Sequence, residues 1–174
     1  GGTEANNWVI KGTAGGLLVS AYEHHSVLNA ARSEYDSERD VDFIPPKSIG
    51  LVLPEDVRLA WPKKADWPEG VSLVSVMAVN NELGTINPVD EIAEAVHKRK
   101  ALFHTDAVQA CGKVDIDVSK IPVDMLSVSG HKFHAPKGIG IFYVRKGTKI
   151  KPFMLGGHQE GGRRAGTENV PYII

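Results

Sequence analysis

Residues Ser127–Gly140 read SVSGHKFHAPKGIG, and they join two apolar runs, Val123–Val128 and Ile139–Val144. Both runs have the length and composition of buried strands, so this part of the sequence predicts a turn between two strands of a sheet. Lys132 stands inside the turn, directly after a glycine and a histidine. Whether Lys132 is buried or solvated therefore depends on how these two strands lie in the sheet.

The lysine has two readings. A lysine held at the end of a buried strand loses hydration, and a neutral amine is a nucleophile toward carbonyls, which is the chemistry of a Schiff base. The alternative is a surface turn with a solvated lysine, since most lysines are solvated. The stretch alone favours neither reading, and the rest of the chain has to decide.

Strand and helix patterns alternate before this stretch. We expect strands at 17–21, 41–44, 71–79 and 101–104, and helices at 2–13, 25–35, 54–60 and 88–98. The run 71–79 is apolar enough to be a central strand that is covered on both faces. This alternation predicts an α/β fold with a mostly parallel sheet flanked by helices, as in an α/β/α sandwich.

Polar residues follow the expected strands. They are His24, Asn81, Asp106 and Lys132. Because the carboxyl ends of parallel strands meet at one edge of a sheet, where ligands bind, we expect these four to gather there. Bland alternatives stay open for three of them: a helix-capping or solvated histidine, an amide that satisfies loop backbone groups, and an aspartate that caps the next turn.

Two glycine-rich segments suit anions. Gly1–Asn7 predicts a glycine turn that opens a helix, whose free N–H groups attract phosphate; the alternative is an N-cap at Thr3. Gly156–Asn169 is rich in glycine and arginine, and it suits anion contact more than it suits a flexible linker.

The totals exclude several classes. The 174 residues carry 20 basic and 21 acidic side chains, which gives no basis for binding to nucleic acid or to a membrane surface. One cysteine, Cys111, excludes an internal disulfide and a cysteine-rich zinc site. No apolar run reaches membrane-spanning length, and no signal peptide is visible. We expect a cytoplasmic protein, with an organelle left open.

The ends of the chain are unusual. Gly1 begins inside a loop that leads into a helix, and Ile174 ends inside an apolar run. We therefore expect residues 1–174 to be one domain that is incomplete at both ends.

Six motifs together resemble the cysteine desulfurase and selenocysteine lyase group of the class V aminotransferase superfamily, whose enzymes use pyridoxal 5′-phosphate (PLP). The matching segments, in family order, are 2–7 (GTEANN), 23–28 (EHHSVL), 80–85 (NNELGT), 104–109 (HTDAVQ), 129–140 (SGHK with PKGIG) and 164–169 (RAGTEN). The resemblance implies the large, PLP-binding domain of the fold, with a C-terminal small domain absent from this chain.

The resemblance implies three catalytic residues. Lys132 would form the internal aldimine with PLP and later move protons at the substrate Cα. Asp106 would pair with the pyridinium nitrogen and keep the ring an electron sink, and His24 would stack on the ring face.

The remaining implied roles concern cofactor binding. Asn81 and Gln109 would hydrogen-bond near the phenolic oxygen of the ring. The phosphate would be held by Gly2, Thr3, Ser129 and His131, with Thr167 reaching the phosphate of a neighbouring subunit. The implied assembly is a homodimer with shared active sites, and a sulfur-acceptor protein is a further implied partner.

The implied reaction is removal of sulfur or selenium from L-cysteine or L-selenocysteine to give L-alanine, in the context of sulfur metabolism and iron–sulfur cluster assembly. The nucleophilic cysteine of the family and its substrate-carboxylate arginine lie C-terminal to every matched motif, so this piece alone is expected to be inactive. Gly161, Ala165 and Ala135 depart from the residues that the family often carries, which are arginine, serine and glycine.

Three alternatives stay open. One is another class V aminotransferase or lyase, and a second is a non-catalytic fragment or paralogue. The third is a metal hydrolase that would use the histidines His24, His25, His104, His131 and His134, although no ligand motif of known spacing is present and no metal is expected.

Overall fold

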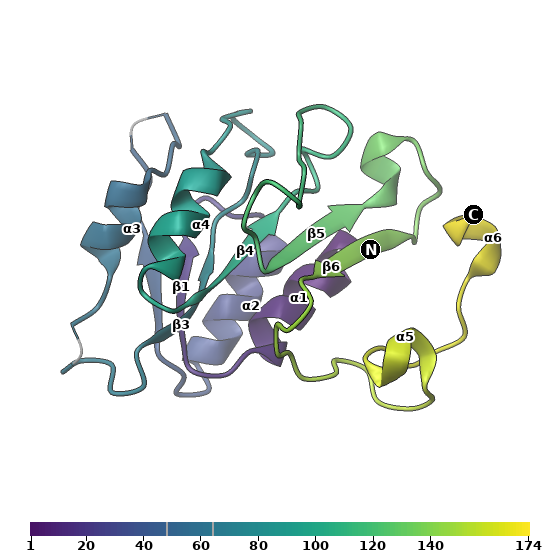
Figure 1. Ribbon diagram of the computed structural model, residues 1–174, viewed down its shortest axis with the longest axis horizontal. Helices are drawn as coiled ribbons and strands as arrows, with labels where there is room; N and C mark the ends of the chain where they lie inside the picture. Colours follow the sequence, from purple (N-terminus) through teal and green to yellow (C-terminus); the bar gives the residue numbers. More distant parts are fainter. Residues whose placement is uncertain (48, 64) are drawn as a thin grey trace.

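The computed structural model describes residues 1–47, 49–63 and 65–174. The elements are α1 (Gly2–Gly12), β1 (Gly16–Ser20), α2 (His25–Tyr35), β2 (Val41–Ile44), α3 (Pro54–Ala60), β3 (Val71–Ser75), α4 (Val89–His97), β4 (Leu102–Asp106), β5 (Met125–Ser129), the 3₁₀ helix η1 (Gly130–Phe133), β6 (Gly140–Val144), α5 (Gln159–Gly162) and α6 (Val170–Ile173). Helices and strands alternate along the chain as expected, and Figure 1 shows α3 at one end of the molecule and α5 and α6 at the other.

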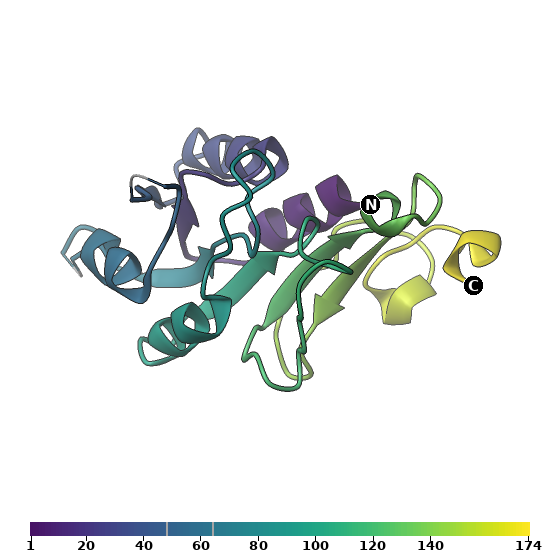
Figure 2. The same ribbon diagram turned by 90° about the horizontal axis from the view of Figure 1, so that it is seen from above.

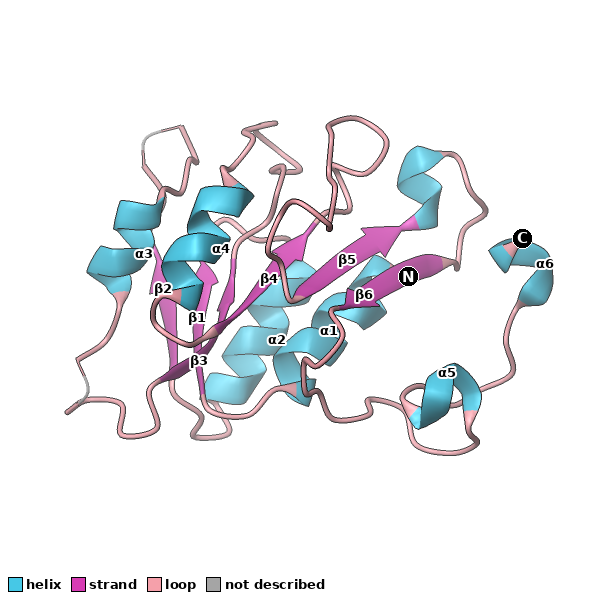
Figure 3. Cartoon of the chain, in the orientation of Figure 1, coloured by secondary structure: helices cyan, strands magenta, loops and turns pink. Residues whose placement is uncertain are grey.

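The strands form one sheet in the order β2-β1-β3-β4-β5-β6. All neighbouring pairs are parallel except β5 and β6, which are antiparallel and are joined through η1. Figure 3 shows the strands as one continuous magenta layer. The predicted α/β class and mostly parallel sheet are therefore confirmed.

Helices cover both faces of the sheet. Figure 2 shows α1 and α2 on one face and α3 and α4 on the other. Each face has its own apolar core: Val9, Ile10 and Val27 lie in the first, and Ile92 and Phe103 lie in the second, all fully buried. The layers form the expected α/β/α arrangement. Among the helices described, none combines the length and apolar character needed to cross a bilayer.

Two strand predictions need correction. The strand expected at 71–79 ends as a regular strand at Ser75, although the N–H groups of Val76 and Ala78 still donate to carbonyls of β4. The N–H of Met77, between them, donates instead to the side chain of Glu23, which interrupts the ladder toward β1. The second correction concerns the apolar run Ile139–Val144, which is predicted to be a buried strand. It forms β6, which lies at the edge of the sheet, and its Ile141 is 56% exposed.

A polar bridge crosses the centre of the sheet. His104 on β4 is fully buried, with Nδ1 lying 2.9 Å from Ser75 Oγ on β3 and Nε2 lying 3.0 Å from Ser127 Oγ on β5. Both ring nitrogens thus have partners, and three neighbouring strands are tied together without a charge. Burial lowers the pKa of this imidazole from its ordinary 6.5 to about 3.

The buried histidine makes stability depend on pH. Unfolded His104 takes up a proton below pH ~6.5, whereas folded His104 stays neutral down to about pH 3. The unfolded state binds more protons across this window, so the free energy of unfolding is expected to fall by up to about 1.4 kcal/mol per pH unit as the pH drops. Urea unfolding at pH 7 and pH 5 will show a smaller difference for His104→Gln than for the unchanged protein. His158→Gln, at an exposed site, is the control, and equal differences for all three proteins would contradict this account.

Candidate active site

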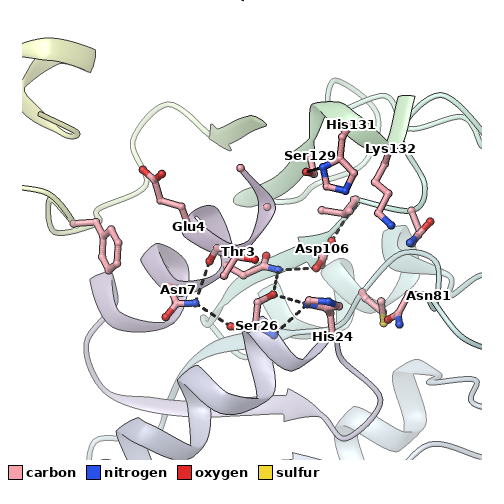
Figure 4. Close-up of a pocket in the computed structure, with 17 residues that line it drawn as sticks. Thr3, Glu4, Asn7, His24, Ser26, Asn81, Asp106, Ser129, His131 and Lys132 are labelled. Atoms are coloured by element: carbon pink, nitrogen blue, oxygen red, sulfur yellow. Dashed lines mark hydrogen bonds between the residues drawn. The ribbon is translucent and has the colours of Figure 1, made fainter. Parts of the chain in front are cut away.

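A pocket of about 780 Å³ opens at the carboxyl ends of the parallel strands. It gathers residues that are far apart in the sequence, including the predicted site residues Gly2, Thr3, His24, Asn81, Asp106, Gln109, Ser129, His131 and Lys132. Figure 4 shows most of these side chains converging on one space. Thr167 does not line this pocket and is exposed.

Asp106 supplies a buried carboxylate at this pocket. It is the last residue of β4 and is 2% exposed. Its Oδ2 accepts a hydrogen bond from Asn6 Nδ2 at 2.7 Å, and its Oδ1 accepts one from the N–H of Val108 at 2.8 Å. Burial raises the pKa of this carboxyl, while the bonds from Val108 and Asn6 and the nearby His24 oppose the rise. Asp106 caps the following turn, as one reading proposed, and also lines the pocket, as the other required.

A second carboxyl, Glu23, lies next to the pocket and was not predicted. Glu23 is 5% exposed, and its Oε1 accepts the N–H of Met77. Its Oε2 has no partner among the residues described. Burial first, and then the charge of Asp106, raise the pKa of Glu23 well above its ordinary range. Two neighbouring buried carboxyls cannot both ionise cheaply, and the rise is stronger for Glu23 than for Asp106, whose two hydrogen bonds oppose it, so the neutral form is favoured at Glu23.

His24 has a double position. It is the N-cap residue of α2, where its Nδ1 accepts the N–H of Ser26 at 3.1 Å. The same imidazole lines the pocket. His24 therefore caps α2 and also lines the pocket, because capping occupies Nδ1 and leaves the ring faces available.

The start of α1 forms a site suited to an anion. Gly1, not Thr3, is the N-cap, so the predicted alternative of a Thr3 cap is wrong. The first N–H groups of an α-helix lack partners within the helix, and they point out of its N-terminus. A side chain at Gly2 would bring its Cβ within 2.9 Å of Val108 Cγ2 and 3.3 Å of Ser129 Cβ. Glycine at this position thus allows the helix start to lie against the ends of the strands.

Two residues of the lysine turn lie beside this helix start. Ser129 Oγ is 2.9 Å from His131 Nδ1, and both residues line the pocket. Figure 4 shows the pair next to the first turn of α1. A hydroxyl, an imidazole and free backbone N–H groups together form a set of donors for phosphate oxygens.

Lys132 lies in η1 and reaches into the same pocket, with its amine directed toward the Asp106 side (Figure 4). The side chain is exposed, so of the two readings of Lys132 the structure bears out the solvated lysine in a turn and contradicts the desolvated one. The reason is local: η1 carries the chain beyond the end of β5, and the pocket is open to solvent there.

The predicted amides fall into two groups. Asn80 Oδ1 accepts the N–H groups of Glu82 and Leu83 and so stabilises its own loop, while Asn81 lines the pocket. Gln109 also lines the pocket, and its Oε1 accepts a hydrogen bond from Lys113. The loop-stabilising role that was the alternative for Asn81 therefore belongs to its neighbour Asn80, and Asn81 itself lines the pocket.

Sequence reasoning missed the side chains that support the site, above all Asn6, Ser26 and Glu23. Asn6 lies on the buried face of α1 with Val9 and Ile10, so a polar residue in a helix's apolar stripe was the available signal. Glu23 stands directly beyond an apolar strand, where an unpaired charge is costly. Such signals mark a residue as unusual without saying what it contacts.

The histidines of the metal-hydrolase alternative are dispersed. His104 lies inside the sheet between two serines, and only His24 and His131 of that set line the pocket. Within the described ranges, no group of three or more His, Cys, Asp or Glu residues is arranged to hold a metal ion.

An ion pair docks the glycine-rich tail next to the pocket. Arg164 Nε and Nη2 donate to the carboxylate of Glu4 on α1, at 2.8 and 3.2 Å. The hydrogen bond from Arg164 is the main reason that the pKa of Glu4 lies below its ordinary value. Glu4 lines the pocket, so this contact joins residues 156–169 to its rim.

Comparison with known proteins identifies relatives over the whole chain. A family described as aminotransferase class-V matches residues 1–174. "Cysteine desulfurase IscS" from Methanosarcina thermophila is 45% identical over 100% of this chain and 43% of its own length. The protein of the same description from Dictyoglomus turgidum is 42% identical over 100% of this chain and 44% of its own length.

Solved structures are also similar to this chain over almost its whole length. One described as "SspA in complex with cysteine" superposes with a TM-score of 0.92 at 40% identity, over 99% of this chain and 51% of the other. A "NifS-like protein" gives a TM-score of 0.90 at 39% identity, over 99% and 48%. The chain thus spans less than half the length of the Methanosarcina and Dictyoglomus proteins.

The Glu4–Arg164 pair predicts a local effect of mutation. Arg164→Gln is expected to speed amide hydrogen exchange in residues 159–169 by up to about fivefold, since partly exposed ion pairs contribute up to ~1 kcal/mol. Global thermal stability should change little. Arg163→Gln, which changes the adjacent exposed arginine, is the matched control. Equal exchange rates in the two variants would show that the ion pair does not hold the tail.

Proposed function

The chain belongs to the class V aminotransferase family, and we propose that it is the cofactor-binding part of a PLP-dependent cysteine desulfurase. The pocket carries this proposal, because it combines an amine, a buried carboxylate and a free helix N-terminus. PLP has a group to match each of them: a carbonyl, a basic ring nitrogen and a phosphate.

The residues of the pocket fit PLP in charge as well as in kind. Asp106 is a buried carboxylate whose described partners, Asn6 and Val108, are neutral, so a protonated ring nitrogen would supply its missing counter-charge. The glycine at position 2 lets the start of α1 pack against Val108 and Ser129, which places the N–H groups of the helix at the pocket, where they would attract a phosphate. A volume of about 780 Å³ leaves space for a small substrate beside the cofactor.

Each residue then has a defined task. When bound, PLP supplies an electron sink that stabilises negative charge developing at the substrate Cα. Lys132 would hold the cofactor covalently through Nζ, and would later carry a proton to or from the substrate Cα. Asp106 would keep the ring nitrogen protonated, and the imidazole of His24 would lie against the ring face.

The other predicted residues would orient the cofactor. Asn81 and Gln109 would donate hydrogen bonds near the phenolic oxygen. The phosphate would be bound by the first N–H groups of α1, at Gly2 and Thr3, and by Ser129 and His131. Thr167 would serve a neighbouring subunit, which is consistent with its exposure outside this pocket.

The substrate proposal is L-cysteine, which would yield L-alanine while its sulfur passes to an acceptor thiol; L-selenocysteine is the related alternative. Support comes from the relatives named cysteine desulfurase and from the similar protein that was solved with cysteine. Cys111 is half-buried in the turns after β4 and does not line the pocket, so the acceptor thiol would come from elsewhere. The homodimer, the sulfur-acceptor protein and the cytoplasmic location remain predictions.

Lysine substitution tests the cofactor assignment. Lys132→Ala is expected to abolish the visible absorption of bound PLP and the covalent adduct that borohydride reduction leaves on the protein. Lys137→Ala, an exposed lysine of the same turn, should keep both signals. A borohydride-reducible linkage that survives in Lys132→Ala would sink the assignment.

Product analysis tests the reaction. With dithiothreitol present, the longer protein that carries this chain is expected to release sulfide and L-alanine from L-cysteine. The 174-residue chain, which spans 43% of a curated relative, should release none that is measurable. An amino-transfer product without sulfide would favour the alternative of another class V enzyme, and robust sulfide release by the 174 residues alone would show that nothing further is needed.

A further inference from the structure

A chain of hydrogen bonds joins the buried carboxylate to the histidine of the pocket. Asn6 Nδ2 lies 2.7 Å from Asp106 Oδ2 and 2.9 Å from Ser26 Oγ, and Ser26 Oγ lies 2.8 Å from His24 Nδ1. Figure 4 shows these contacts as dashed lines between α1, β4 and the start of α2. Two side chains to which no role has yet been assigned, Asn6 and Ser26, thus connect the two groups that would bracket a bound ring.

The direction of each hydrogen bond follows from the ends of this chain. An ionised carboxylate only accepts, so the Asn6 amide must turn its NH₂ group toward Asp106. The second hydrogen of that NH₂ group then donates to Ser26 Oγ. With its oxygen accepting from Asn6, the Ser26 hydroxyl has its own hydrogen left to donate, and His24 Nδ1 is the acceptor within reach.

A backbone group removes the opposite arrangement. The N–H of Ser26 also points at His24 Nδ1, at 3.1 Å, and a backbone N–H can only donate. If Nδ1 carried a proton, two N–H groups would face one another. Nδ1 must therefore be the bare nitrogen, and the proton of the neutral ring must be on Nε2.

The Asn6 amide shows that its orientation is set by Asp106. Asn6 is 1% exposed, and its Oδ1 has no partner among the residues described. Leaving a buried carbonyl oxygen unpaired is unfavourable. Rotating the amide would leave its NH₂ group unpaired instead and would place Oδ1 against the carboxylate of Asp106, so the carboxylate holds the amide in place.

We propose that Asn6 and Ser26 are positioning residues that hold His24 as the Nε2-protonated tautomer, with its ring plane fixed across the pocket from the charged Asp106. The proposal deepens the proposed function, on which its catalytic meaning rests, because it concerns the histidine that would lie against the cofactor ring. Asn6 does not contact His24, and its effect passes through the Ser26 hydroxyl. All of these hydrogen bonds join residues of the protein, so the arrangement is expected to form before a cofactor binds.

Nitrogen NMR of the histidine rings tests this inference without the cofactor. In the full chain, freed of PLP and labelled with ¹⁵N at histidine, His24 is expected to show a protonated Nε2 and a bare Nδ1 near neutral pH. Ser26→Ala should lower the ratio of this tautomer to the other by about fivefold, the effect of losing one hydrogen bond. Asn6→Leu should shift the two His24 nitrogens in the same direction.

Matched substitutions separate this effect from general loosening. Ser75→Ala removes a hydroxyl from a different histidine, His104, and should leave the His24 signals unchanged. Asn7→Leu removes the amide that donates to the carbonyls of Thr3 and Ser26. These hydrogen bonds are not part of the series that runs from Asp106 to His24 Nδ1, so this variant should also leave the His24 signals unchanged. If Asn6→Leu does not fold, Ser26→Ala and the unchanged protein still decide the matter.

The outcomes distinguish this inference from the proposed function. A protonated Nδ1 in the unchanged protein, or a tautomer ratio that Ser26→Ala leaves unaltered, would overturn the role of Asn6 and Ser26 even in a protein that binds PLP through Lys132. The expected tautomer in a protein that fails to bind PLP would leave the positioning result standing and would overturn the proposed function instead.

Discussion

A carboxylate that is 2% exposed at the end of a central strand is the constraint on which the rest of this site depends. A buried charge costs several kcal/mol unless hydrogen bonds or a counter-charge compensate it. The chain supplies Asp106 with an amide from α1 and a backbone N–H, and burial raises the pKa of the neighbouring Glu23, which favours its neutral form. These contacts hold the charge without cancelling it. The pocket therefore retains one unbalanced negative group, which is what a site for a protonated ring requires.

The sheet explains why these groups meet. Parallel strands place their carboxyl ends at one edge, so His24, Asp106 and Ser129 come together although the chain separates them widely. The start of α1 completes the site. It can lie against the end of β5 because position 2 is glycine, and a side chain there would meet Ser129. One edge of the sheet thus presents a carboxylate and a helix N-terminus, which attract opposite charges.

Most of the fold followed from local patterns, and the failures have physical causes. Periodicity located α2, α3 and β2 to the residue, because their apolar spacing and flanking prolines or polar residues are local properties. The strand expected to reach Val79 ends at Ser75, because the Glu23 side chain takes the N–H of Met77. The partly exposed β6 looked buried because apolar composition does not reveal whether a strand lies at an edge. The two readings of Lys132 could not be separated for a related reason, since the exposure of a lysine depends on what covers the turn.

The amino-acid sequence by itself determined the alternation of strands and helices, the polar residues at the strand ends and the family motifs that give Lys132, Asp106 and His24 their proposed roles. The tertiary structure alone decided how those residues are held. Asn6 and Asp106 are one hundred positions apart, and their 2.7 Å contact exists only because α1 packs across the end of β4. The direction of the Asn6 hydrogen bonds and the raised pKa of Glu23 depend on such long-range contacts and on burial, and neither is written in local sequence.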